Sequence, residues 1–193
     1  MNQTFTENKT FDRADLSKTS FEKGEYENCK FHNCDFSNGN FSGTTFIDCE
    51  FINCNLSLVK LIKTTFRDTK FIDCKMLGLL FDNCNEFGLS FSFDKCIINH
   101  SSFYRTKIRK TIFKDSQLHG TDFTECDLTN SVFEHCDLAN AKFVNTIIEK
   151  TDFRTSYNYS IDLEINRIKK TKFSLSEIAG LLDKYDIEID RTN

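Results

Sequence analysis

The sequence predicts a right-handed, four-sided β-helix that ends in a C-terminal α-helical cap. Three observations lead to this fold class: large apolar residues recur every five positions, small residues stand two positions before them, and Phe is sorted into one series that repeats every 20 residues. A period of five fits neither an α-helix nor an alternating strand. It indicates a coil in which each five-residue unit forms one side and then turns a corner.

The apolar series starts at Phe11 and runs to Phe81, then resumes at Phe93 and ends at Phe153. If four units make one turn, residues 20 apart stack, and one stack consists of Phe only: Phe11, Phe31, Phe51, Phe71, Phe93, Phe113, Phe133 and Phe153. Burial of these rings, each worth roughly 1.5–3 kcal/mol, can hold about seven coils together without disulfides. The absence of Pro agrees with a ladder that needs every backbone N–H donor.

Short stretches within the series follow one pattern, a small residue, then Asp, then Phe or Leu: CDF at 34–36, TDF at 121–123 and CDL at 126–128 and 136–138. On these residues the chain resembles the pentapeptide-repeat family over roughly residues 9–155. The resemblance implies an all-β quadrilateral solenoid as one domain, with residues 156–193 as a separate capping segment.

Between Phe81 and Phe93 lie two residues more than the period allows. Counting Phe87 as a centre restores four units per turn, with single-residue bulges on either side and Phe91 too bulky for the small position it would take. Such bulges often mark functional places, but an insertion that the fold merely tolerates explains them equally well. We take the candidate bulge residues to be Asn85, Glu86, Phe87 and Phe91.

After Phe153 the sequence pattern changes. Ser174 and Glu177 have capping-box spacing, and apolar residues follow at helical intervals, which predicts a helix over about 175–185. The helix either only covers the last coil or also joins two molecules end to end, as the resemblance implies. The candidate dimerisation residues are Ile178, Leu181, Leu182 and Tyr185.

The sequence contains no group of residues that would support catalysis. Eight of its nine Cys occupy the small inward position and are explained as buried thiols, while Cys84 falls at the interruption. The run CKFHNC at 29–34 suggests zinc ligands, but His32 should point outward while the two thiols point inward from adjacent sides. No nucleophile-base pair or Gly-rich phosphate loop is present. We therefore expect a protein that is not an enzyme and needs no cofactor or metal.

Surface charge offers a candidate binding surface. Seven acids and one base lie between positions 115 and 149, whereas residues 60–75 and 105–114 are basic. Ordinary solvated surface explains the acidic stretch and the basic stretches alike. The alternative for the acidic stretch is a face that imitates the phosphates of duplex DNA. The candidate acidic face consists of Asp115, Asp122, Glu125, Asp127, Glu134 and Asp137.

The layout of a capped coil is similar to that of the Qnr-type quinolone-resistance proteins of this family. The resemblance implies a dimer that mimics DNA, binds bacterial DNA gyrase or topoisomerase IV, and shields it from quinolones. The alternative is an interaction scaffold for another protein. The chain has no signal-like or membrane-spanning stretch and a formal charge of −4, so we expect a cytoplasmic protein that binds neither membranes nor nucleic acid directly.

Overall fold

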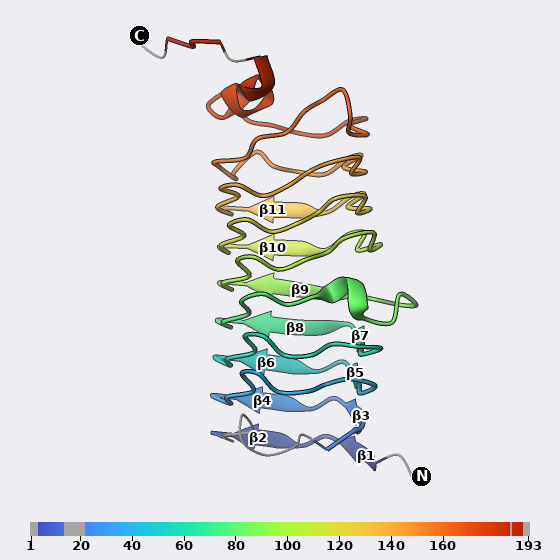
Figure 1. The fold of residues 1–193 in the computed structure, drawn as a ribbon. Coiled ribbons are helices and arrows are strands. Elements are labelled where there is room, and N and C mark those ends of the chain that lie inside the picture. Colours follow the sequence, from blue (N-terminus) through green and yellow to red (C-terminus); the bar gives the residue numbers. More distant parts are fainter. Residues whose placement is uncertain (1–3, 14–21, 186, 191–193) are drawn as a thin grey trace.

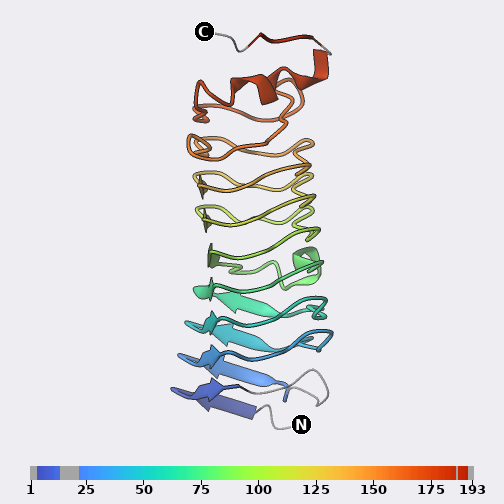
Figure 2. The ribbon, with the colours of Figure 1, turned by 90° about the vertical axis from the view of Figure 1, so that its left-hand side faces the viewer.

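The computed structural model describes residues 4–13, 22–185 and 187–190, so the series positions Leu16 and Phe21 lie outside the described residues. The chain winds as a parallel β-solenoid, a rod of stacked coils with its N-terminus at one end and its C-terminus at the other (Figure 1). Figure 2 shows the same stack from a second direction. The predicted all-β fold with four repeats per coil is confirmed.

We number the four sides of the rod after the central residues of one coil: side 1 at Phe31, side 2 at Phe36, side 3 at Phe41 and side 4 at Phe46. Two of the sides carry parallel sheets. The sheet on side 4 has the order β1 (Thr4–Glu7), β3 (Gly24–Glu27), β5 (Thr45–Ile47) and β7 (Thr65–Arg67). The seven-stranded sheet on side 1 comprises β2 (Thr10–Asp12), β4 (Lys30–His32), β6 (Glu50–Ile52), β8 (Thr69–Ile72), β9 (Phe91–Asp94), β10 (Ile112–Lys114) and β11 (Val132–Glu134).

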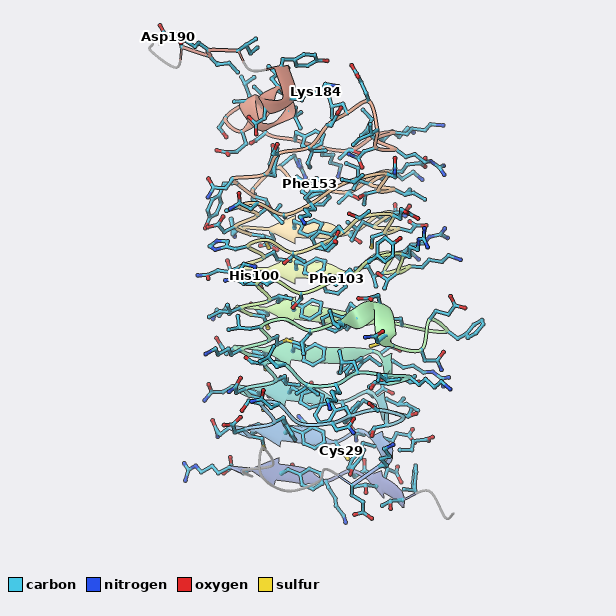
Figure 3. All side chains as sticks on the ribbon, viewed as in Figure 1. Cys29, His100, Phe103, Phe153, Lys184 and Asp190 are labelled. Atoms are coloured by element: carbon cyan, nitrogen blue, oxygen red, sulfur yellow. The ribbon has the colours of Figure 1, made fainter. Side chains whose placement is uncertain are left out.

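The Phe column predicted from the sequence is a continuous stack of rings behind side 1. Consecutive ring centroids from Phe11 to Phe153 lie 4.6–5.3 Å apart, with interplanar angles of 7–18°. These spacings follow the distance between neighbouring β-strands, at which offset ring stacking is favourable. In Figure 3, Phe103 and Phe153 lie inside the coil, whereas His100 lies at its edge.

The small inward position is selected for hydrogen bonding as well as for size. The Cys54 thiol donates to the carbonyl of Phe31 at 3.2 Å, and the Thr64 hydroxyl donates to the carbonyl of Phe41 at 2.9 Å. In each case the acceptor lies 23 residues earlier, in the preceding coil. Cys, Ser and Thr therefore exchange freely at this position, since each is small and carries a donor.

The interruption differs from its prediction. The 3-10 helix η1 (Phe81–Asn83) leads into a loop that projects from the rod beside β9, drawn in green in Figure 1. Phe87, predicted as a buried centre, is 73% exposed, and Phe91, predicted to be too bulky for its position, is buried. The prediction of two single-residue bulges around a buried Phe87 is wrong.

Phe91 lies where the loop returns to the coil. Only residues 86–88 project from side 4, whereas Asn85 and Ser90 stay hydrogen-bonded to the coil below and Leu89 is buried. The Phe91 ring packs in the core beside this interruption. Its centroid lies 5.3 Å from that of Phe81 and 6.4 Å from that of Phe66. Phe81 stays in register and stacks on Phe103 at 4.5 Å, so the coil closes normally on either side of the loop.

The coil extends beyond the last Phe of the predicted series. Phe173 stacks on Phe153 at 5.6 Å, and parallel bridges join residue 147 to 167 and 152 to 172. Three of the four central positions of this turn, Leu163, Ile168 and Phe173, keep the five-residue spacing, but Asn158 breaks the series directly after Phe153 and hid the turn. Asn166 keeps the hydrogen bond of the small position, since its side-chain amide donates to the carbonyl of Phe143 at 2.9 Å.

The predicted terminal helix is helical but not α-helical. It forms two short 3-10 helices, η2 (Ile178–Leu181) and η3 (Asp183–Tyr185). The predicted capping box does not form, because the Glu177 carboxylate accepts the backbone N–H of Asn158 instead. The tighter 3-10 winding brings Leu181 over the last coil, where this side chain is buried and joins the core.

Candidate interaction surfaces

The structure distributes the six predicted acidic residues over all four sides of the rod. Their strands and bridges place Asp115 and Glu134 on side 1 or its corner, Asp137 on side 2, Asp122 and Glu125 on side 3, and Asp127 on side 4. Residues 115–137 span little more than one turn, so neighbours in sequence necessarily face different directions. The six acids do not form one continuous face.

Five of these six acids have a cationic or imidazole partner within 4 Å. Asp115 and Glu134 lie 3.4 and 4.0 Å from Nδ1 of His135. Glu125 accepts a hydrogen bond from Arg105 at 2.7 Å, which holds the pKa of Glu125 below its usual value. The Asp137 carboxylate lies 2.8 Å from His119 Nε2. Arg105 and His119 each stand one coil below the acid that they contact, so the stacking of coils pairs these charges.

Asp127 is the most enclosed of the six acids. Its side chain is almost fully buried and lies 2.6 Å from a terminal nitrogen of Arg109. Burial raises the pKa of Asp127, but hydrogen bonds from Arg109 and Thr129 lower it by more. Asp127 therefore holds two coils together and presents little free charge to a partner.

A different group of acids meets the requirement for a free acidic surface. Glu7, Glu25, Glu27 and Asp48 lie on β1, β3 and the corner after β5, on side 4 or its corner near the N-terminal end. We call these four residues the N-terminal acidic cluster. Within the described ranges none of them has an ion pair within 4 Å. Counting every 20 residues from Glu7 to Glu27 could have revealed the cluster in the sequence.

The candidate residues at the interruption divide into two pairs. Phe91 is buried, and the half-buried Asn85 bonds to the preceding coil, where its backbone N–H reaches the carbonyl of Thr64 at 2.8 Å. Both residues hold the loop in place. Glu86 and Phe87 are exposed on the projecting part of the loop and remain available to a partner.

The C-terminal candidates divide in the same way. Leu181 is buried and Leu182 half-buried, so these two side chains cover the last coil. Ile178 and Tyr185 are 43% and 52% exposed, and the sequence analysis missed Leu175, which is 86% exposed. The end of the rod thus presents several apolar side chains to solvent.

The chemistry of the thiols and imidazoles is limited. Burial raises the pKa of Cys49 and of Cys126 to about 12, although backbone or side-chain hydrogen bonds oppose it. No group of three side chains that could hold a metal ion occurs among the residues that the structure describes. Over the same residues, no helix is long and apolar enough to cross a membrane.

The repeat geometry agrees with the family comparison. The model for the pentapeptide repeat region matches residues 24–91 and 90–157, which together cover most of the chain. The chain belongs to the pentapeptide-repeat family. A comparison with curated protein sequences found no match.

Solved pentapeptide-repeat structures include two similar ones, both of trypsin-treated variants of QnrB1, a plasmid-mediated fluoroquinolone resistance protein. The first is 16% identical, with 98% of this chain and 100% of that chain covered and a TM-score of 0.61. The second is 17% identical, with 97% and 98% covered and a TM-score of 0.52. At these identities the likeness shows a shared fold.

Proposed function

We propose that this pentapeptide-repeat protein acts by binding another protein and is not an enzyme, and that its partner is a bacterial type II topoisomerase, DNA gyrase or topoisomerase IV. The observation that carries this proposal is the match of the fold to QnrB1 over nearly the whole of both chains. Binding at the DNA-cleaving subunits would shield the enzyme from quinolones or modulate its activity. Such a partner places the protein in the cytoplasm.

The contact surface that we favour is the N-terminal acidic cluster. Three of its carboxylates lie on side 4 and that of Asp48 lies at the adjoining corner, and β1 and β3 set Glu7 directly beside Glu27. Like charges on neighbouring strands destabilise the sheet unless a partner neutralises them. A DNA-binding surface that normally meets phosphates would supply that neutralisation. Of the six acids predicted from sequence, only Asp122 lacks a cationic or imidazole partner in the described part of the chain, and it is the one we retain as a secondary contact.

We further propose that two molecules join at their C-terminal ends. Leu175, Ile178 and Tyr185 would meet their counterparts there, which removes exposed apolar surface at the end of each rod. End-to-end pairing gives a rod of twice the length, with an acidic cluster at each far end. Changing Leu175 and Ile178 to Ser should convert the dimer to a monomer in light scattering, whereas the chain should stay folded because Leu181 still covers the last coil.

The distribution of charge favours a second candidate, an interaction scaffold for a different protein. Glu125 and Asp127 are bound to arginines of the preceding coil, so the C-terminal half of the rod offers less free acid than its sequence indicates. A scaffold needs no continuous phosphate-like stripe.

A supercoiling assay separates the two candidates. Purified protein is added to gyrase of the same source, with and without ciprofloxacin, and compared with the double variant Glu25→Gln, Glu27→Gln. A matched control, Asp115→Asn with Glu134→Gln, removes two acids from side 1. Topoisomerase binding predicts inhibition or drug rescue that the first variant weakens and the control largely keeps. No effect of excess wild-type protein in either assay would leave the scaffold.

A further inference from the structure

An apolar groove lies where side 2 turns into side 3, below the projecting loop. Leu58, Ile62 and Leu80 line it and are 58%, 55% and 48% exposed. The groove encloses about 360 Å³, with Gly78 in its lining. Exposed apolar side chains elsewhere on the coils mostly stand singly, whereas here three of them border one hollow.

The backbone at Leu58 is unusual. Leu58 has a φ of 59°, in the left-handed region, and the stacked corners below and above it are occupied by Asn38, Gly78 and His100. Among the described non-Gly residues with positive φ, Leu58 is the only apolar one. Asn and Gly adopt this conformation more readily than Leu. The chain thus keeps a large, exposed apolar side chain at a corner where that residue type lowers stability. Backbone strain that is retained in this way points to a function.

Gly78 completes the arrangement. A Cβ atom at position 78 would lie 2.9 Å from Cδ2 of Leu58, so the Leu58 side chain leans over a residue that has none. Gly78 itself has a φ of 64°, which suits Gly. The two stacked corners therefore form one surface, with Leu58 as its wall and Gly78 as its floor.

The charge around the groove is positive. The two coil segments that carry it, residues 54–63 and 74–83, contain Lys60, Lys63 and Lys75 but only one acid, Asp82. In the part of the chain that the structure describes, none of these lysines has a carboxylate within 4 Å, whereas Lys30 and Lys70 share Glu50. A second copy docked here would set lysines against lysines, which disfavours self-association.

We propose that this groove binds an acidic protein segment that carries apolar side chains. The apolar side chains fill the hollow between Leu58, Ile62 and Leu80, and the carboxylates meet the free lysines at its rim. The groove lies on sides 2 and 3, away from the N-terminal acidic cluster on side 4. Its occupancy is therefore independent of the proposed topoisomerase contact, and either can fail without the other.

The test selects a display library of short random peptides on the full-length protein. We expect enrichment of sequences rich in Asp or Glu together with Leu, Ile or Phe. A synthetic copy of the best peptide is then titrated by fluorescence anisotropy. Changing Leu58 to Asn should weaken binding about tenfold or more, since a buried Leu contact is lost, and should leave the melting temperature unchanged or raised because Asn suits the corner.

Two further variants complete the experiment. Ile112→Thr removes a side chain that is also about half exposed but lies on side 1, and it should leave binding unchanged. Lys60→Gln with Lys63→Gln should weaken binding and flatten its dependence on salt. The proposal is overturned if no acidic apolar sequences are enriched, if Leu58→Asn and Ile112→Thr bind alike, or if sedimentation shows wild-type self-association that Leu58→Asn abolishes.

Discussion

Sides 1 and 4 of the rod respond differently to the same two-residue insertion. Side 1 passes it without change: β8 pairs with β9, and the rings of Phe71 and Phe93 stack at 5.3 Å. On side 4 the sheet ends at β7, and the central residues change from aromatic below the loop to Ile108, Leu128 and Ile148 above it. The continuous ring stack thus carries the register of the whole rod, and the adjacent side 4 accommodates irregularity.

The strongest test of this difference is to remove a ring from side 1 at the insertion. Phe93→Ala should lower the free energy of unfolding by about 3–5 kcal/mol, because the ring is fully buried and stacked on both faces. Phe87→Ala should change it by less than about 0.5 kcal/mol, since that ring is exposed. Urea unfolding followed by circular dichroism measures both. Equal effects would show that the ring stack does not carry the register.

Removing the ring that fills the gap on side 4 should cost less. Phe91→Ala leaves a cavity beneath the loop, but residues 86–88 are exposed and not packed in the core, so the loop can shift inward, and the cost of a cavity falls when its surroundings collapse. We expect a loss of about 2–3 kcal/mol in the same unfolding experiment. A loss greater than that of Phe93→Ala would reverse the ranking of the two sides.

Acid should affect the C-terminal half of the rod first. Hydrogen bonds from Arg154 lower the pKa of Asp152 from its ordinary value near 4 to about 2. Because the carboxyl binds its proton less readily in the folded state, its contribution to stability is present above about pH 4 and is lost as the pH falls towards 2. Hydrogen exchange at pH 5 and pH 3 should show greater loss of protection near Asp152 than in β3, and Asp152→Asn should abolish the difference at that site.

The smallest effect expected concerns the thiols. Eight of the nine Cys are buried, and burial also raises the pKa of Cys84. Thiolates are the reactive form, so Ellman's reagent should modify the native protein slowly and at Cys84 first, where the ladder is interrupted. All nine thiols should react at once in guanidinium chloride. Fast native reaction at Cys54 or Cys74 would show that the coils open near the insertion.

Much of this fold can be predicted from the spacing of Phe and of the small residues, because each coil repeats the same contacts. The loop escaped prediction because Phe87 and Phe91 compete for one space, and only the three-dimensional path shows which ring enters it. The acidic residues were misjudged for another reason. Neighbours in sequence point to different sides, and pairs such as Arg105 with Glu125 form between coils. Comparing residues 20 apart would have shown that neighbouring acids lie on different sides and that residues such as Arg105 and Glu125 lie next to each other.

The ring stack on side 1 also restricts how such a rod can change in length. Removing one five-residue unit would rotate every later residue by one side, so that Phe stacks would meet the Leu and Met column and surface charges would change sides. Removing a whole turn would leave all contacts along the rod intact and only shorten it. Related rods can therefore differ in length only by whole turns. A surface that must stay aligned with a partner is then displaced along the rod by a whole number of turns.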